Sequence, residues 1–271
     1  MEIDWLELWR ELIISNPHTP DCESIKRYKN YTHQSRQRPD SLLDFVLNSI
    51  DSSVTVLDIG AGDGRWTIPL AKVAKTVTAV DPAGDMLKGL RENITTAQAN
   101  IQIIQSSWEE ANVEAHDIVV CAHAMYTSPD LAAFVHKMEQ HARKACYMII
   151  RLPPVDGVIG ELSNAIYGRL HDSANAVIAY NALYSLGIYA NVLVEKDIYC
   201  WANDTLEEAF IRAKRHLHLE STSTHDGLIR DALYKRLISK NGRYLWPDGM
   251  RSALLWWSPS TVVKQKEPEV Q

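Results

Sequence analysis

Three glycines alternate with other residues directly after a short apolar run that ends in an acid. The stretch 54–66 places Asp58 before Gly60, Gly62 and Gly64. Because glycine has no Cβ, the backbone of such a turn can take positive φ and lie against a bound molecule, with N–H groups near the positive end of the following helix. We therefore expect a ligand-binding turn, with Asp58 pointing into the same crevice.

The spacing of these glycines narrows the range of possible ligands. A dinucleotide fingerprint requires G-x-G-x-x-G, and counting from Gly60 puts Arg65 at the third glycine. A phosphate-binding P-loop requires Lys followed by Ser or Thr, and Trp66 stands where that motif has its hydroxyl. NAD and ATP are therefore both disfavoured.

A second apolar run, 77–81, ends in Asp81, seventeen residues after Gly64. The acid-x-G-x-G-x-G turn beginning at Asp58 and followed by this acid resembles class I S-adenosylmethionine-dependent methyltransferases. In that family the second acid holds the two ribose hydroxyls, a task that suits a carboxylate because it accepts both O–H bonds. The resemblance implies S-adenosylmethionine as cofactor and S-adenosylhomocysteine as product.

The resemblance also implies where the rest of the cofactor lies. Ser106 stands where the family most often has an acid for the adenine amino group, and we expect Ser107 and Trp108 to supply a hydrogen bond and an aromatic wall instead. Packing in the core is the alternative for Trp108. The residues expected to bind the cofactor are Asp58, Gly60, Ala61, Gly62, Gly64, Asp81, Pro82, Met86, Ser107, Trp108, Ala122 and His123.

The loop after the fourth predicted strand carries the candidate catalytic residues, His123 and Tyr126. Methyl transfer from a sulfonium is an in-line displacement, so the enzyme positions the nucleophile and, where needed, removes its proton. Because the unperturbed pKa of histidine is close to neutrality, His123 could act as that base. The alternative is a histidine that is hydrogen-bonded to cofactor or backbone and moves no proton.

Periodicity places these residues in an α/β fold. The predicted strands number seven, and the resemblance implies that they form a mostly parallel, Rossmann-like sheet with helices on both faces. Ser128 and Pro129 are predicted to begin a helix that runs to about residue 144, and the sixth strand is predicted from 188 to 201. The predicted divisions are a helical N-terminal lid at 1–50, a methyltransferase domain at 51–258 with substrate-side insertions at 155–185 and 204–250, and a tail at 259–271.

Composition limits the partners. The formal net charge is −6, which weighs against a polynucleotide substrate. One basic group, predicted as a solvated helix face or as a lid that attracts an anionic substrate, comprises Lys26, Arg27, Lys29, Arg36 and Arg38.

The four cysteines lack metal-ligand spacing, so we predict free thiols, no metal site and a cytoplasmic location. Acids near the amino terminus argue against a secretory signal, and no apolar stretch is long enough to predict a membrane span.

The function predicted from these observations is methylation of a small-molecule acceptor at oxygen or nitrogen. The chain lacks the Asn/Asp-Pro-Pro-aromatic motif of amino-group methylation of bases, and Cys121 is not in a Pro-Cys pair. Methylation of RNA or protein remains an alternative, as does a non-catalytic partner protein that binds S-adenosylmethionine or its product. The sequence leaves the oligomeric state open, and a homodimer remains one of the alternatives.

Overall fold

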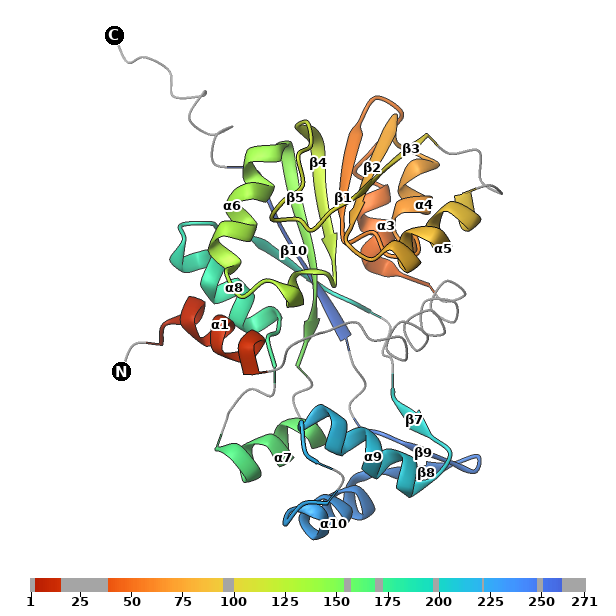
Figure 1. Cartoon of the computed structure of the whole chain (residues 1–271), viewed down its shortest axis with the longest axis vertical. Helices are drawn as coiled ribbons and strands as arrows, with labels where there is room; N and C mark the ends of the chain where they lie inside the picture. The colour runs from red at the N-terminus through yellow and green to blue at the C-terminus, as the bar shows by residue number, and fades with distance from the viewer. Residues whose placement is uncertain are drawn as a thin grey trace.

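A computed structural model of the chain contains a seven-stranded sheet with helices on both faces and a smaller lobe at one edge (Figure 1). The structure describes residues 3–15, 39–94, 100–153, 157–168, 173–196, 200–220, 222–247 and 251–259. The strand order is β3-β2-β1-β4-β5-β10-β6, in which β10 runs antiparallel to both of its neighbours. The strands are β1 (Thr55–Ile59), β2 (Thr76–Asp81), β3 (Ile101–Gln105), β4 (His116–Ala122), β5 (Ala142–Leu152), β6 (Asn191–Val194) and β10 (Arg251–Trp257).

The central strand β1 is mostly apolar because it is covered on both faces. Val56, Leu57 and Ile59 are all buried, and the strand pairs in parallel with β2 on one side and β4 on the other. Apolar side chains on both faces are the pattern expected of an interior parallel strand, and Asp58 is the charged exception. The order of connection reverses between β1 and β4, so the carboxyl ends of these two strands flank the crevice where parallel sheets bind ligands.

Helices α3, α4 and α5 cover one face of the sheet. Their bounds are α3 (Ser41–Leu47), α4 (Thr67–Ala71) and α5 (Gly84–Ile94). Leu42 and Leu70 join a buried cluster with Val56 and Val77, while Leu90 belongs to a second cluster on the same face. The glycine turn therefore lies between β1 and a helix whose apolar side is fixed on the sheet.

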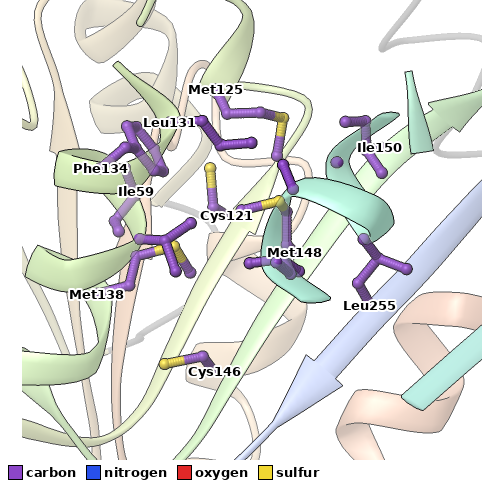
Figure 2. Packing of buried hydrophobic residues seen from close by; sticks show 14 of the residues in the cluster. Ile59, Cys121, Met125, Leu131, Phe134, Met138, Cys146, Met148, Ile150 and Leu255 are labelled. Atoms are coloured by element: carbon purple, nitrogen blue, oxygen red, sulfur yellow. The ribbon is translucent and has the colours of Figure 1, made fainter. Parts of the chain in front are cut away.

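The other face carries α1 (Trp5–Ser15), α6 (Leu131–His141) and α8 (Ala176–Ser185). Figure 2 shows the sulfur-bearing side chains of Cys121, Met138 and Met148 within the cluster that these helices bury against the strands. Burial raises the pKa of the Cys121 thiol, so this cysteine is a packing residue with no reactive thiolate.

The smaller lobe has its own core and sheet. It consists of α7 (Val158–Tyr167), β7 (Ala202–Asn203), α9 (Leu206–His216), α10 (Asp226–Arg236), β8 (Ile238–Lys240) and β9 (Arg243–Leu245), with strand order β7-β9-β8. Phe210, Ile229 and Trp246 are buried in its cluster. The chain enters and leaves this lobe from the end of β5, the end of β6 and the start of β10, which all lie at the carboxyl edge of the main sheet (Figure 1).

The helix predicted with Ser128 as its cap and Pro129 as its first residue begins two residues later, at Leu131. Asp130 is the N-cap, and its carboxylate accepts a hydrogen bond of 2.9 Å from the backbone N–H of Ala133. A carboxylate at this position also meets the positive end of the helix dipole. Ser128 is buried before the helix, where its carbonyl accepts a hydrogen bond from Trp9 Nε1.

The predicted sixth strand is too long. Of the described residues in the predicted range, Asn191–Val194 pairs with β10, and the following pair, Ala202–Asn203, pairs with β9 in the smaller lobe. The three-stranded sheet of that lobe was not predicted from the sequence because its strands have only two or three residues.

The amino-terminal helix lies away from the glycine turn. Trp9, Leu12 and Ile13 of α1 pack into the cluster shared with α6 and α8, so this part of the predicted lid forms part of the sheet's helical layer. The same cluster contains α8, which was predicted as part of a substrate-side insertion. Residues 16–38 of the predicted lid lie outside the described residues.

Candidate functional site

The glycine turn is fixed to the end of β2 by hydrogen bonds that its unusual backbone makes possible. Gly60 and Gly62 have φ of 71° and 56°, in the left-handed region that side chains other than glycine rarely occupy. The backbone N–H groups of Gly60 and Ala61 both donate to the carbonyl of Val80, at 2.7 and 3.1 Å. The turn and the second acid are therefore held as one unit.

Asp81 closes this unit. Its Oδ2 accepts from the N–H of Gly62 and its Oδ1 accepts from the N–H of Ala83, both at 2.8 Å. Burial raises the pKa of Asp81, and the two backbone hydrogen bonds oppose that rise. Each oxygen has a further lone pair, so the carboxylate can still accept two hydroxyl groups.

Asp58 lies deeper in the crevice, with 1% of its surface exposed. Its Oδ2 accepts a hydrogen bond of 2.6 Å from the hydroxyl of Thr67, at the start of α4. Burial raises the pKa of Asp58 to about 6, while the Thr67 hydrogen bond lowers it and the charge of Asp81 raises it further. The two acids of the motif therefore converge on the same end of the sheet.

The described residues around Asp58 enclose a cavity of about 10 Å³, which is room for about one water molecule. Its lining consists of Asp58, Gly60, Ala61, Arg65, Trp66, Ala122 and His123. The indole N–H of Trp66 is buried in this lining and has no hydrogen-bond partner within the described part of the chain. A bound molecule could satisfy it, because a buried donor without a partner costs about 1–3 kcal/mol.

His123 has an unusual backbone conformation at the end of β4. Its φ is 59°, and its N–H donates to the carbonyl of Ile149 at 2.9 Å. The ring nitrogen Nε2 lies 3.3 Å from the hydroxyl of Ser252. Burial, together with the positive charges of Arg65 and Arg151, lowers the pKa of His123 to about 3, so the imidazole is neutral at pH 7.

Tyr126 lies beside His123, with ring centroids 6.4 Å apart and planes inclined by 15°. Its hydroxyl oxygen accepts a hydrogen bond of 2.7 Å from the backbone N–H of Arg151. The Arg151 guanidinium in turn donates to the hydroxyl of Ser173. The loop after β4 is therefore tied to the end of β5, and the two candidate catalytic residues lie together.

Arg65 and Asp40 form an ion pair beside the crevice that the sequence did not predict. Nη2 of Arg65 lies 2.8 Å from Oδ2 of Asp40, and both side chains are largely buried. Asp40 is also the N-cap of α3, accepting from the N–H of Leu43. The position of Arg65, directly after the third glycine, was the available signal, but its partner is 25 residues away in the chain.

Trp108 does not form an aromatic wall of the site. It is buried with Phe134, its indole N–H donates to the Phe134 carbonyl, and the ammonium of Lys137 lies 4.8 Å from the ring centroid. The predicted cofactor contact is therefore corrected to a core residue that packs against α6. Ser107 caps a local turn, where its hydroxyl accepts from the N–H of Glu110.

The remaining predicted residues follow the second acid. Met86 is buried in the first turn of α5, and Pro82 is exposed directly after Asp81. The basic group at 26–38 lies outside the described residues. Within the described ranges, no cluster of His, Cys, Asp and Glu could hold a metal ion, and no helix is long and apolar enough to cross a membrane.

Known proteins resemble the chain in sequence and in fold. A family model described as a methyltransferase domain matches residues 56–145. An uncharacterized protein of Haemophilus influenzae is 24% identical across 96% of this chain and 98% of its own length. The ubiquinone biosynthesis O-methyltransferase of Hydrogenovibrio crunogenus is 33% identical over 85 residues, which are 30% of this chain and 35% of that enzyme.

The YcgJ protein of Bacillus subtilis has a similar fold, with a TM-score of 0.54 and 16% identity over 80% of this chain and 97% of that one. The matched domain begins in β1 and ends in β5, so it contains the glycine turn, both acids and the loop of His123. The domain match and the fold are both consistent with the position of Asp58 and Asp81 at the carboxyl ends of neighbouring parallel strands. Residues 56–145 of the chain match a methyltransferase domain, and the chain has a Rossmann-like fold with a seven-stranded, mostly parallel sheet.

Proposed function

We propose that the enzyme transfers a methyl group to an oxygen or nitrogen atom of a small molecule. The main support for this proposal is the position of the smaller lobe. The lobe connects to the main sheet at the carboxyl ends of the strands, and the glycine turn and His123 lie at the same edge (Figure 1). A lobe with its own core on that edge can enclose an acceptor and exclude water. Oxygen as the acceptor atom is supported by the O-methyltransferase similarity of the 85 matched residues.

The residues proposed for the cofactor are Asp81 for the ribose, the turn from Gly60 to Gly64 for close backbone contact, and Asp58 deeper in the crevice. The donor set fits an adenosyl compound that carries hydroxyl, amino and carboxylate groups, because carboxylates, backbone N–H groups and one unsatisfied indole N–H surround the crevice. S-Adenosylmethionine supplies an electrophilic methyl group. The chain supplies position, a dry environment and acceptors for protons.

The acceptor class can be tested by product release. The purified protein is incubated with S-adenosylmethionine and with cell extract separated into small-molecule, RNA and protein fractions, and S-adenosylhomocysteine is measured. Release that depends on the small-molecule fraction supports the proposal. Release of S-adenosylhomocysteine with only the RNA or the protein fraction would contradict the proposal and favour a macromolecular substrate. Binding of S-adenosylmethionine and S-adenosylhomocysteine without any methyl transfer would favour a non-catalytic partner protein.

A further inference from the structure

Trp66 follows the glycine turn and carries a buried polar atom, the indole nitrogen Nε1. Its ring packs in the apolar cluster that α3 and α4 form with the sheet, together with Leu42 and Leu70. Trp66 is 4% exposed, and its indole N–H forms no hydrogen bond with any residue that the structure describes. Such donors are rare in folded proteins because they have lost water without gaining a partner. The N–H is therefore available to a bound molecule.

The cavity beside this indole is lined by groups of both charges. Trp66 shares the lining with Asp58 and Arg65. Burial raises the pKa of Asp58 to about 6, so its carboxylate is mostly ionised at pH 7. The guanidinium of Arg65 is held in place by its ion pair with Asp40, at 2.8 Å. A molecule that carries an anionic group next to an ammonium group matches this combination of donors and acceptors.

The order of the strands indicates which part of the cofactor reaches this cavity. Asp81, proposed for the ribose, lies at the carboxyl end of β2, on one side of β1. The cavity lies toward the other side, because Ala122 of β4 joins Asp58 of β1 in its lining. The ribose of S-adenosylmethionine is joined to adenine on one side and, through the sulfur, to an amino acid end on the other. Adenine is uncharged, so the amino acid end, with its ammonium and carboxylate groups, fits the charged cavity.

We propose that Trp66 is a cofactor-binding residue, whose indole N–H donates to a carboxylate oxygen at the amino acid end of S-adenosylmethionine. This inference rests on the cofactor of the proposed function. The cavity has about the volume of one water molecule, which suits a single oxygen atom. A carboxylate is the strongest acceptor that the cofactor offers, since its ribose hydroxyls and adenine nitrogens are neutral. Arg65 adds a positive charge beside the carboxylate, and Asp58 accepts from the neighbouring ammonium group.

Two compounds separate this contact from the rest of the cofactor site. S-Adenosylhomocysteine has the same amino acid end as the cofactor. Methylthioadenosine has the same adenosine and a thioether sulfur, but it lacks the ammonium and carboxylate groups. A change in the fold or in the ribose contact alters the binding of both compounds, whereas loss of a hydrogen bond to the carboxylate alters the binding of S-adenosylhomocysteine alone.

The test is calorimetric titration of wild type and Trp66→Phe with these two compounds. Phenylalanine keeps an aromatic ring and removes the N–H group. We expect Trp66→Phe to bind S-adenosylhomocysteine roughly 10–100-fold more weakly, the usual loss for a hydrogen bond to a charged group, and to bind methylthioadenosine as the wild type does. Trp9→Phe is the matched control, because Trp9 is also buried but its N–H donates to the carbonyl of Ser128 at 3.0 Å. Its affinities for both compounds should equal those of the wild type.

A second measurement follows the indole proton itself by NMR. The chain has eight tryptophans, and the N–H signal of Trp66 is assigned by its loss in Trp66→Phe. If that variant does not fold, benzothienylalanine at position 66 replaces it in both experiments, because a sulfur atom takes the place of the N–H in a ring of nearly the same shape. We expect the proton signal to move downfield with S-adenosylhomocysteine and to stay in place with methylthioadenosine.

Unchanged affinity of the variant for S-adenosylhomocysteine would overturn the proposal. Equal losses for the two compounds would also overturn it, since the effect would then arise in the fold or at the ribose. A Trp66 proton that does not respond to S-adenosylhomocysteine would show that the N–H meets water only, with the same consequence. These measurements contain no methyl acceptor, so their failure is distinguishable from failure of the proposed function, which product release tests separately.

Discussion

Gly60 of the ligand-binding turn lies directly against Ala124 of the loop after β4. A Cβ added to Gly60 would lie 2.0 Å from the Ala124 Cβ, far inside van der Waals contact. The glycine therefore has two roles: it permits a φ of 71°, and it lets the loop that carries His123 close on the turn. The position of His123 relative to Asp58 depends on this contact.

We predict that Gly60→Ala destabilises the fold by about 2–4 kcal/mol, from the left-handed backbone and from the overlap with Ala124. Gly187→Ala is a matched control, because Gly187 has φ of 77° and no atom within 4 Å of an added Cβ. It should cost only the backbone part, about 1–2 kcal/mol. Urea unfolding measures the free energy of unfolding of both variants. Equal losses in Gly60→Ala and Gly187→Ala would show that the contact between Gly60 and Ala124 is not tight. Ala124→Gly should partly rescue Gly60→Ala.

Asp58→Asn should stabilise the protein at pH 7 while weakening cofactor binding. Burial raises the pKa of Asp58 from 3.8 to about 6, so the folded state binds a proton more tightly than the unfolded state. The contribution of Asp58 to the free energy of unfolding is fully present below pH 3.8 and is lost as the pH rises through 6. At neutral pH the buried charge therefore lowers the free energy of unfolding by about 1–3 kcal/mol. Asparagine keeps an oxygen for the Thr67 hydroxyl and carries no charge.

The measurement for Asp58→Asn is the free energy of unfolding at pH 4 and pH 7, with the exposed Asp231→Asn as control. The gain in stability should be large at pH 7 and small at pH 4. A gain that does not change with pH, or a loss at pH 7, would contradict the assigned burial of the charge.

His123 should make the protein sensitive to acid. Its pKa is lowered to about 3, so between pH 6.5 and 3 the unfolded state binds a proton that the folded state does not. Stability from this group is complete above pH 6.5 and is lost as the pH falls, at up to about 1.4 kcal/mol per pH unit. His123→Asn should lessen that loss, and asparagine also tolerates the positive φ of 59°.

The check on His123 is urea unfolding from pH 4 to pH 8. The exposed His136→Asn on α6 serves as the matched control and should leave the acid slope unchanged. Parallel curves for wild type and His123→Asn would show that the imidazole is protonated in the folded protein as readily as in the unfolded one.

The cofactor half of the fold was predictable because its signals are local in the chain. The glycine turn, Asp58 and Asp81 lie within 24 consecutive residues, and a strand, a turn and a helix form from neighbouring residues. The strand order then follows from short right-handed connections between parallel strands. The seven-stranded sheet was confirmed on this basis.

The rest of the site depends on contacts between distant segments. His123 and Ser252 are 129 residues apart, and nothing in either local sequence indicates that β10 brings them together. Trp108 follows the third strand in the chain, as an adenine wall would, but packing against α6 buries it. The smaller lobe was predicted as helices alone because its strands are too short to show a period of two.

The measurement that tests the central claim most directly is calorimetric titration of wild type and Asp81→Ala with S-adenosylmethionine and S-adenosylhomocysteine, with Asp231→Ala as a control at an exposed acid. We predict that wild type and the control bind both compounds, and that Asp81→Ala binds S-adenosylmethionine more weakly by about 1–3 kcal/mol while keeping the melting behaviour of a folded protein. Equal affinity of wild type and Asp81→Ala would contradict the role of Asp81, and absence of binding to the wild type would contradict the cofactor site as a whole.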